Sequence, residues 1–111
     1  MDQDEIRALR RDLGDALLAR LSGRSISSVH AYANGRRPVT PLIARRLEWV
    51  SHVTFSLAGG YNAIGMRAWF VRPRVQLGQR SPLASLGPDW TPSDASVAHV
   101  EKLAATLRGP G

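Results

Sequence analysis

Apolar residues recur every three or four positions along most of the chain, which is the spacing of one face of an α-helix. The pattern is clearest from Ile6 to Leu13 and from Ile43 to Leu57. Glycine, proline and short polar residues divide it into segments. The segments expected to be helical are DEIRALRRDL, DALLARLSG, SISSVHAYANG, TPLIARRLEWVSHVTFSLAGG, YNAIGMRAWFVRP, SPLASLG and TPSDASVAHVEKLAATLRG.

Several of these segments begin with a residue that favours the start of a helix. A short side-chain oxygen at the N-cap accepts a hydrogen bond from a free backbone N–H. The expected N-caps are Asp15, Ser25, Thr40 and Thr91. Strand signals are weak, and only FVRPRVQL is compatible with an extended segment. We therefore predict an all-α fold, with a helix-turn-helix bundle over residues 1–58 and a small helical subdomain over 59–111.

Two neighbouring segments have the pattern of a helix-turn-helix, in which two short helices are joined by a turn that contains glycine. Ala19 is small where the two helices would cross, and Gly23 follows at the tight turn. Val29 and Tyr32 fall on the inward face of the second helix, and Gly35 closes it. In DNA-binding proteins with this arrangement, the second helix lies in the major groove.

The rest of the second helix carries short polar side chains, which reach base edges without blocking entry into a groove. The predicted base-reading residues are Ser25, Ser27, Ser28, His30, Ala31 and Asn34. Guanidinium groups bind phosphate with two hydrogen bonds. The predicted phosphate-binding residues are Arg24, Arg36, Arg37, Arg45, Arg72 and Arg74. An ordinary helical hairpin with serines for solubility is the alternative interpretation.

The charge distribution favours DNA as the partner. The net charge is +6, and fourteen arginines stand against one lysine. Residues 16–80 hold ten arginines and a single acid, Glu48, whereas residues 1–15 and 89–111 are weakly acidic. Codon usage in a GC-rich genome would explain the ratio of arginine to lysine. It would not explain why acids are missing from the centre.

Several function classes are disfavoured. The chain has no apolar run long enough to span a membrane, and its first residues lack the apolar centre of a signal peptide. It has no cysteine, and its three histidines show no metal-ligand spacing. The pair Gly59–Gly60 lacks the context of a phosphate-binding loop. We expect a cytoplasmic protein that has no membrane partner, no catalytic residues, no metal and no cofactor, and that is not an enzyme.

A second signature lies in NGRRPVTPLIARRLEWV and in GMRAWFVRPRVQLGQRSPLASLG. Together they resemble the Xre/MbcA/ParS antitoxins, which join an Xre-type helix-turn-helix to a small toxin-binding domain. The most specific matching positions are Trp69, Phe70, Pro73, Leu77, Gly78, Pro82, Leu83 and Leu86. The resemblance implies pairing with a RES-domain toxin that consumes NAD, and repression of the operon's own promoter. It also implies that residues 103–111 contact the toxin.

The sequence thus predicts a sequence-specific DNA-binding repressor that acts as the antitoxin of a RES/Xre-type system. One alternative is a phage or mobile-element repressor that uses both halves on DNA and has no toxin partner. Another is a protein-interaction module that neutralises an enzyme without binding DNA. Repressors of this kind often bind two half-sites as dimers. The sequence is compatible with either a homodimer or a monomer. Trp69 and Phe70 are expected to be core residues.

Overall fold

The computed structural model describes residues 1–108, so that residues 109–111 of the predicted toxin-contacting segment lie outside the described part. Within residues 1–108 the chain forms helices and no strand, which confirms the predicted all-α fold. FVRPRVQL contributes only one antiparallel bridge, between Arg74 and Arg80. The helices are α1 (Gln3–Leu13), α2 (Asp15–Ser22), α3 (Ile26–Ala33), α4 (Pro41–Leu57), α5 (Ala63–Val71), α6 (Pro82–Ser85) and α7 (Ala95–Ala105), with short 3-10 helices η1 (Val75–Leu77) and η2 (Thr106–Arg108).

Side-chain caps set where two of the central helices begin. The Ser25 hydroxyl oxygen accepts a hydrogen bond from the Ser28 N–H at 3.1 Å, at the start of α3. The Thr40 hydroxyl oxygen accepts one from the Ile43 N–H at 3.4 Å, and Pro41 is the first residue of α4. Both predicted N-caps are therefore confirmed.

Two other predicted N-caps are wrong. Asp15 is the first residue of α2, and Gly14 occupies the cap position before it. The last long helix begins at Ala95 after the N-cap Asp94, not at Thr91. The Asp94 carboxylate accepts hydrogen bonds from the Thr91 backbone at 3.0 Å and the Thr91 hydroxyl at 3.1 Å. These bonds close a turn that delays the start of the helix.

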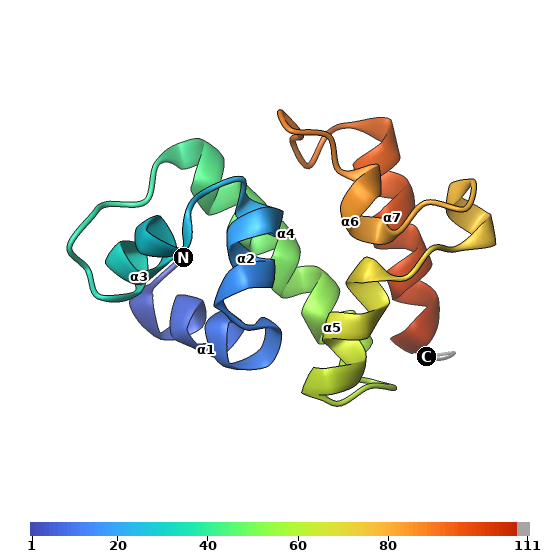
Figure 1. Ribbon diagram of the computed structural model, residues 1–111, viewed down its shortest axis with the longest axis horizontal. Helices are drawn as coiled ribbons and strands as arrows, with labels where there is room; N and C mark the ends of the chain where they lie inside the picture. The colour runs from blue at the N-terminus through green and yellow to red at the C-terminus, as the bar shows by residue number, and fades with distance from the viewer. Residues whose placement is uncertain (109–111) are drawn as a thin grey trace.

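The helices form two groups joined by α4. In Figure 1, α1, α2 and α3 lie at one end, α5, α6 and α7 lie at the other, and α4 runs through the middle. Helix α1 packs against α5, and α4 packs against α7, so the two groups are in direct contact. Helix α3 lies at the end of the molecule that is far from α7 (Figure 1).

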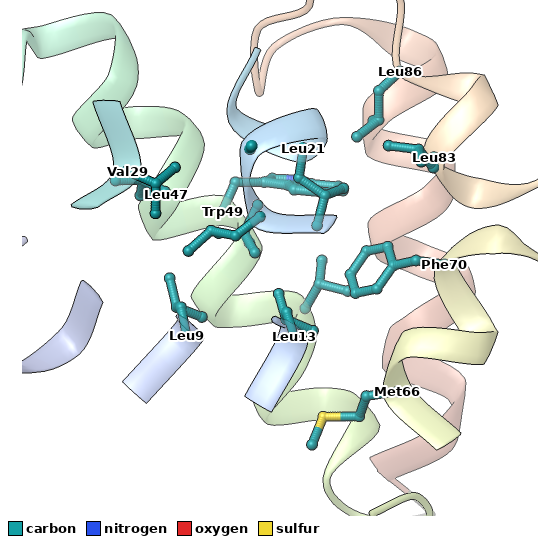
Figure 2. Close-up of a cluster of buried hydrophobic side chains, with 14 of the residues drawn as sticks. Leu9, Leu13, Leu21, Val29, Leu47, Trp49, Met66, Phe70, Leu83 and Leu86 are labelled. Carbon is teal, nitrogen blue, oxygen red and sulfur yellow. The ribbon is translucent and has the colours of Figure 1, made fainter. Parts of the chain in front are cut away.

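One hydrophobic core runs through both groups. Figure 2 shows side chains from the α3 end, such as Val29 and Leu47, continuing through Trp49 to Phe70 and Leu83 at the other end. The predicted units 1–58 and 59–111 therefore share a single core. The fully buried Phe70 and its neighbour Trp69, 1% exposed, confirm the expectation that both are core residues. Burial of such apolar area is the main driving force for folding.

Candidate nucleic-acid interface

A tight turn joins α2 to α3. Gly23 has a φ of 74°, a left-handed conformation that costs glycine little, and it ends α2. The N–H of Gly23 donates to the Arg20 carbonyl at 3.3 Å, and that of Arg24 donates to the Ala19 carbonyl at 3.0 Å. Ala19 is buried between the helices. The expected roles of Ala19 and Gly23 are thus confirmed, and Ser25, the N-cap of α3, follows two residues after Gly23.

Helix α3 has a buried side and an exposed side. Val29 and Tyr32 are buried, as predicted. Ile26, Ser27 and Asn34 are exposed, and Ile26 keeps 45% of its surface accessible. Ser27, His30 and Asn34 follow Ile26 by one, four and eight positions, and these spacings fall within one sector of a helix. The exposed side chains therefore share a face with the half-buried His30. This face, Ile26, Ser27, His30 and Asn34, is the candidate reading face.

Ser28 and Ala31 were expected to lie on that exposed side, and this is wrong, because each is only 9% exposed. The backbone after α3 folds back, so that the N–H groups of Arg36 and Arg37 donate to the Ala31 carbonyl at 2.9 and 3.3 Å. The Arg37 guanidinium donates to the Ser28 hydroxyl at 2.6 Å. The covered side of α3 is therefore wider than the stripe of Val29 and Tyr32 indicates.

His30 and Ser25 are partly committed to contacts within the protein. The His30 Nε2 lies 2.7 Å from Asp15 Oδ2, and the Arg10 Nε donates to Asp15 Oδ1 at 2.8 Å. Hydrogen bonds from Arg10 and His30 lower the pKa of the Asp15 carboxyl to about 2. The Ser25 hydroxyl donates to the Ser28 hydroxyl at 3.1 Å while it caps the helix. The sequence pattern missed this Arg10–Asp15–His30 cluster, because helix packing brings together positions fifteen apart.

The predicted phosphate-binding arginines fall into two classes. Arg24, Arg36, Arg45 and Arg72 are exposed, and within residues 1–108 their guanidinium groups make no hydrogen bond or ion pair. Arg37 is different, since it binds Ser28 and lies 6.0 Å from the centre of the Tyr32 ring. Arg74 stacks 5.0 Å from the centre of the Trp69 ring. Only the first class is available to an external anion without breaking a contact.

Three further arginines of the basic centre bind backbone carbonyls. The Arg67 guanidinium donates to the Asp12 and Arg11 carbonyls at the end of α1, both at 3.0 Å. Arg80 donates to the Ala84 carbonyl in α6. Arg46, which is 5% exposed, donates to the carbonyls of Ser22 and Trp90. Helix C-termini carry partial negative charge, so these side chains stabilise the fold.

The described residues 1–108 hold no group of three or more His, Asp or Glu side chains that is suited to a metal ion. No helix in that part of the chain is long and apolar enough to cross a membrane. No protein-family model, curated protein or solved structure matches this chain.

Proposed function

We propose that the protein is a sequence-specific DNA-binding repressor whose helix α3 enters the major groove. One observation carries the proposal: the reading face of α3 is exposed, and the free arginines Arg24 and Arg36 stand at its two ends. The Asp15 carboxylate, which contacts His30 of this face, is already paired with Arg10 and His30. An anionic duplex would therefore meet cations at both ends of the helix.

The dimensions and chemistry of the face suit a groove. An α-helix with its side chains is about 10–12 Å across, close to the width of the major groove. Ser27 and Asn34 offer hydrogen bonds to base edges, and an Asn amide pairs well with adenine. Ile26, which was not among the predicted base-reading residues, offers apolar contact to a thymine methyl group. Arg24, Arg36 and Arg45 would supply phosphate contacts, which set affinity but not sequence.

Selection of bound duplexes from a random pool tests this proposal, and the symmetry of the selected sequence also reports how many copies bind. With the selected duplex, Asn34→Ala should relax the preference at one base pair. Arg36→Ala should instead weaken binding to all sequences. Binding unaffected by either change, or no enrichment from the pool, would overturn the proposal. Loss of operator affinity in Arg72→Ala would support the alternative in which both halves contact DNA.

The finer proposal is that the repressor is the antitoxin of a RES/Xre-type system, as the sequence resemblance implies. Three exposed apolar side chains in the second half offer contacts to a protein partner, whose interface would bury them. Ile64 is 75% exposed, Val71 is 48% exposed and Val75 is 76% exposed. Co-expression with the neighbouring open reading frame tests this directly. A neighbour that is toxic alone and harmless beside this protein supports it, and a neighbour that is harmless alone contradicts it.

A further inference from the structure

The loop between α6 and α7 reaches back to the end of α2. Trp90, in this loop, is 3% exposed, and its indole N–H donates to the Leu21 carbonyl at 2.9 Å. Leu21 and Ser22 are the last two residues of α2, where backbone carbonyls lack partners within the helix. A residue 69 positions away in sequence therefore supplies a donor beside the helix-turn-helix turn.

Arg46 ties the same two segments together from α4. Its Nε donates to the Trp90 carbonyl and its Nη1 donates to the Ser22 carbonyl, both at 2.9 Å. The guanidinium also lies 5.2 Å from the centre of the Trp90 ring. Within residues 1–108 no carboxylate lies within ion-pair distance of Arg46, so carbonyl groups accept its hydrogen bonds, while the charges of Asp89 and Asp94 act on it from farther away. The negative end of the α2 dipole contributes to that compensation.

The turn itself is shaped around this guanidinium. A Cβ atom at Gly23 would lie 2.7 Å from Nη1 of Arg46, which is too close for an unshifted side chain. Burial lowers the pKa of Arg46 from its ordinary value, and the charge of Arg24 adds to that effect. Gly23 therefore serves two purposes, since it provides the left-handed backbone and leaves room for Arg46.

We propose that Trp90 and Arg46 are positioning residues for the helix-turn-helix, so that the α6–α7 loop of the C-terminal half, held in place by Arg46 of α4, sets the direction in which α3 leaves the turn. This inference rests on the proposed DNA binding for its functional consequence, but its structural part stands independently. The bonds hold the last carbonyls of α2, and α3 starts four residues after Ser22, at Ile26. A partner that displaced the α6–α7 loop would remove these contacts and loosen the turn.

Comparison of Trp90→Phe with Trp49→Phe tests the proposal. The two indoles are edge to face with centres 5.0 Å apart, and both are buried. The Trp49 indole N–H is buried without a hydrogen-bond partner. Trp49→Phe thus removes similar ring area but no hydrogen bond, and it is the matched control.

Amide hydrogen exchange provides the first measurement. In Trp90→Phe, the amides of Gly23 and Arg24 should exchange about tenfold faster than in the wild type, as expected for loss of one buried hydrogen bond. The amide of Gly14, which donates to the Arg10 carbonyl at the α1–α2 joint, should change no more than in Trp49→Phe. Equal rates at Gly23 in the two variants would overturn the proposal.

DNA binding provides the second measurement, which a purely stabilising role would not change. Phosphate contacts govern non-specific affinity, whereas the orientation of α3 governs the preference for the selected duplex. Trp90→Phe should therefore lower the ratio of specific to non-specific affinity about tenfold, and Trp49→Phe should leave it unchanged. Arg46→Lys, which keeps the charge but loses the planar fork, should behave like Trp90→Phe.

The two measurements separate the two proposals. If the wild type binds no duplex from the pool, DNA binding fails, while faster exchange confined to the turn in Trp90→Phe still supports positioning. If the specificity ratio falls equally in Trp90→Phe and Trp49→Phe, the positioning role is refuted and DNA binding stands.

Discussion

The arginines at the α3 end of the molecule and those at the joint between its two helical groups have the same side chain but different surroundings. Arg24 and Arg36 extend into solvent without a partner among the described residues. Arg46 and Arg67 instead donate to carbonyls at the C-terminal ends of α2 and α1. A count of positive charges along the sequence treats the two groups alike. The difference shows that part of the basic centre of this chain stabilises the fold.

The reason lies in the geometry of guanidinium. Its planar fork donates several hydrogen bonds at fixed angles, so one side chain can satisfy carbonyls from two segments. Arg46 does this for the carbonyls of Ser22 and Trp90, whereas Arg67 binds two successive carbonyls of a single helix, α1. Variants that separate fold stability from DNA affinity would test the comparison.

Replacement of Arg46 by Met should have the largest effect. The change leaves the carbonyls of Ser22 and Trp90 without their donor, and each unsatisfied buried group costs about 1–3 kcal/mol. We expect the free energy of unfolding to fall by about 3 kcal/mol in urea titrations. The neighbouring Arg45 is exposed and without a partner among the described residues, so Arg45→Ala should change it by less than about 0.5 kcal/mol. Equal losses in the two variants would remove the distinction.

Replacement of Arg36 by Ala should reduce DNA affinity without reducing stability. Loss of one phosphate contact weakens binding to every duplex and lowers the slope of log K against log salt by about 1. Arg37→Ala is the informative partner, because it also breaks the contacts with Ser28 and Tyr32. We expect Arg37→Ala to lower stability as well, measured by urea unfolding beside fluorescence anisotropy. A stability loss in Arg36→Ala would place Arg36 in the structural class.

The sequence predicted the features of the fold that depend on residues close together in the chain. The caps Ser25 and Thr40, the turn at Gly23 and the buried stripe of Val29 and Tyr32 follow from neighbours within four residues, and the structure confirms them. Burial of Ser28 and Ala31 depends on how the chain after α3 folds back, which no local pattern contains.

The contacts of Arg46 and Trp90 join segments far apart in sequence, yet a signal for each is present. Arg46 lies three residues after Ile43 and four before Val50, which places it on the buried face of its helix. Trp90 is a lone aromatic residue in the polar segment GPDWTPS, and a large apolar side chain there needs a place to be buried. Neither signal names the carbonyl that is bound, because that depends on the packing of α2.

Replacement of Arg67 by Ala should cost about 1 kcal/mol of stability, because two carbonyls at the end of α1 lose their donors but remain accessible to water. Arg72 lies five residues after Arg67 in the chain and has no partner among the described residues, so it provides the control. Arg72→Ala should be neutral in urea unfolding. A neutral Arg67→Ala would show that water replaces the guanidinium at the end of α1 without loss.

The smallest expected effect concerns Asp15, the carboxylate beside the reading face. Its pKa in the folded protein is about 2, below the ordinary value of 3.8, because Arg10 and His30 bind the ionised form. A depressed pKa contributes stability that is fully present above about pH 4 and is lost as the pH falls toward 2. The side chain is 34% exposed, so solvent screening limits the contribution to about 1 kcal/mol or less. The difference in unfolding free energy between wild type and Asp15→Asn should therefore be positive at pH 7, should shrink below about pH 4 and should vanish as the pH falls through 2. The exposed Asp4, paired with Arg7, serves as the control at pH 7, because Asp4→Asn removes only a surface ion pair and should give a difference near zero. A gap between wild type and Asp15→Asn that was as large at pH 2 as at pH 7 would show that the variant loses packing and not an ion pair.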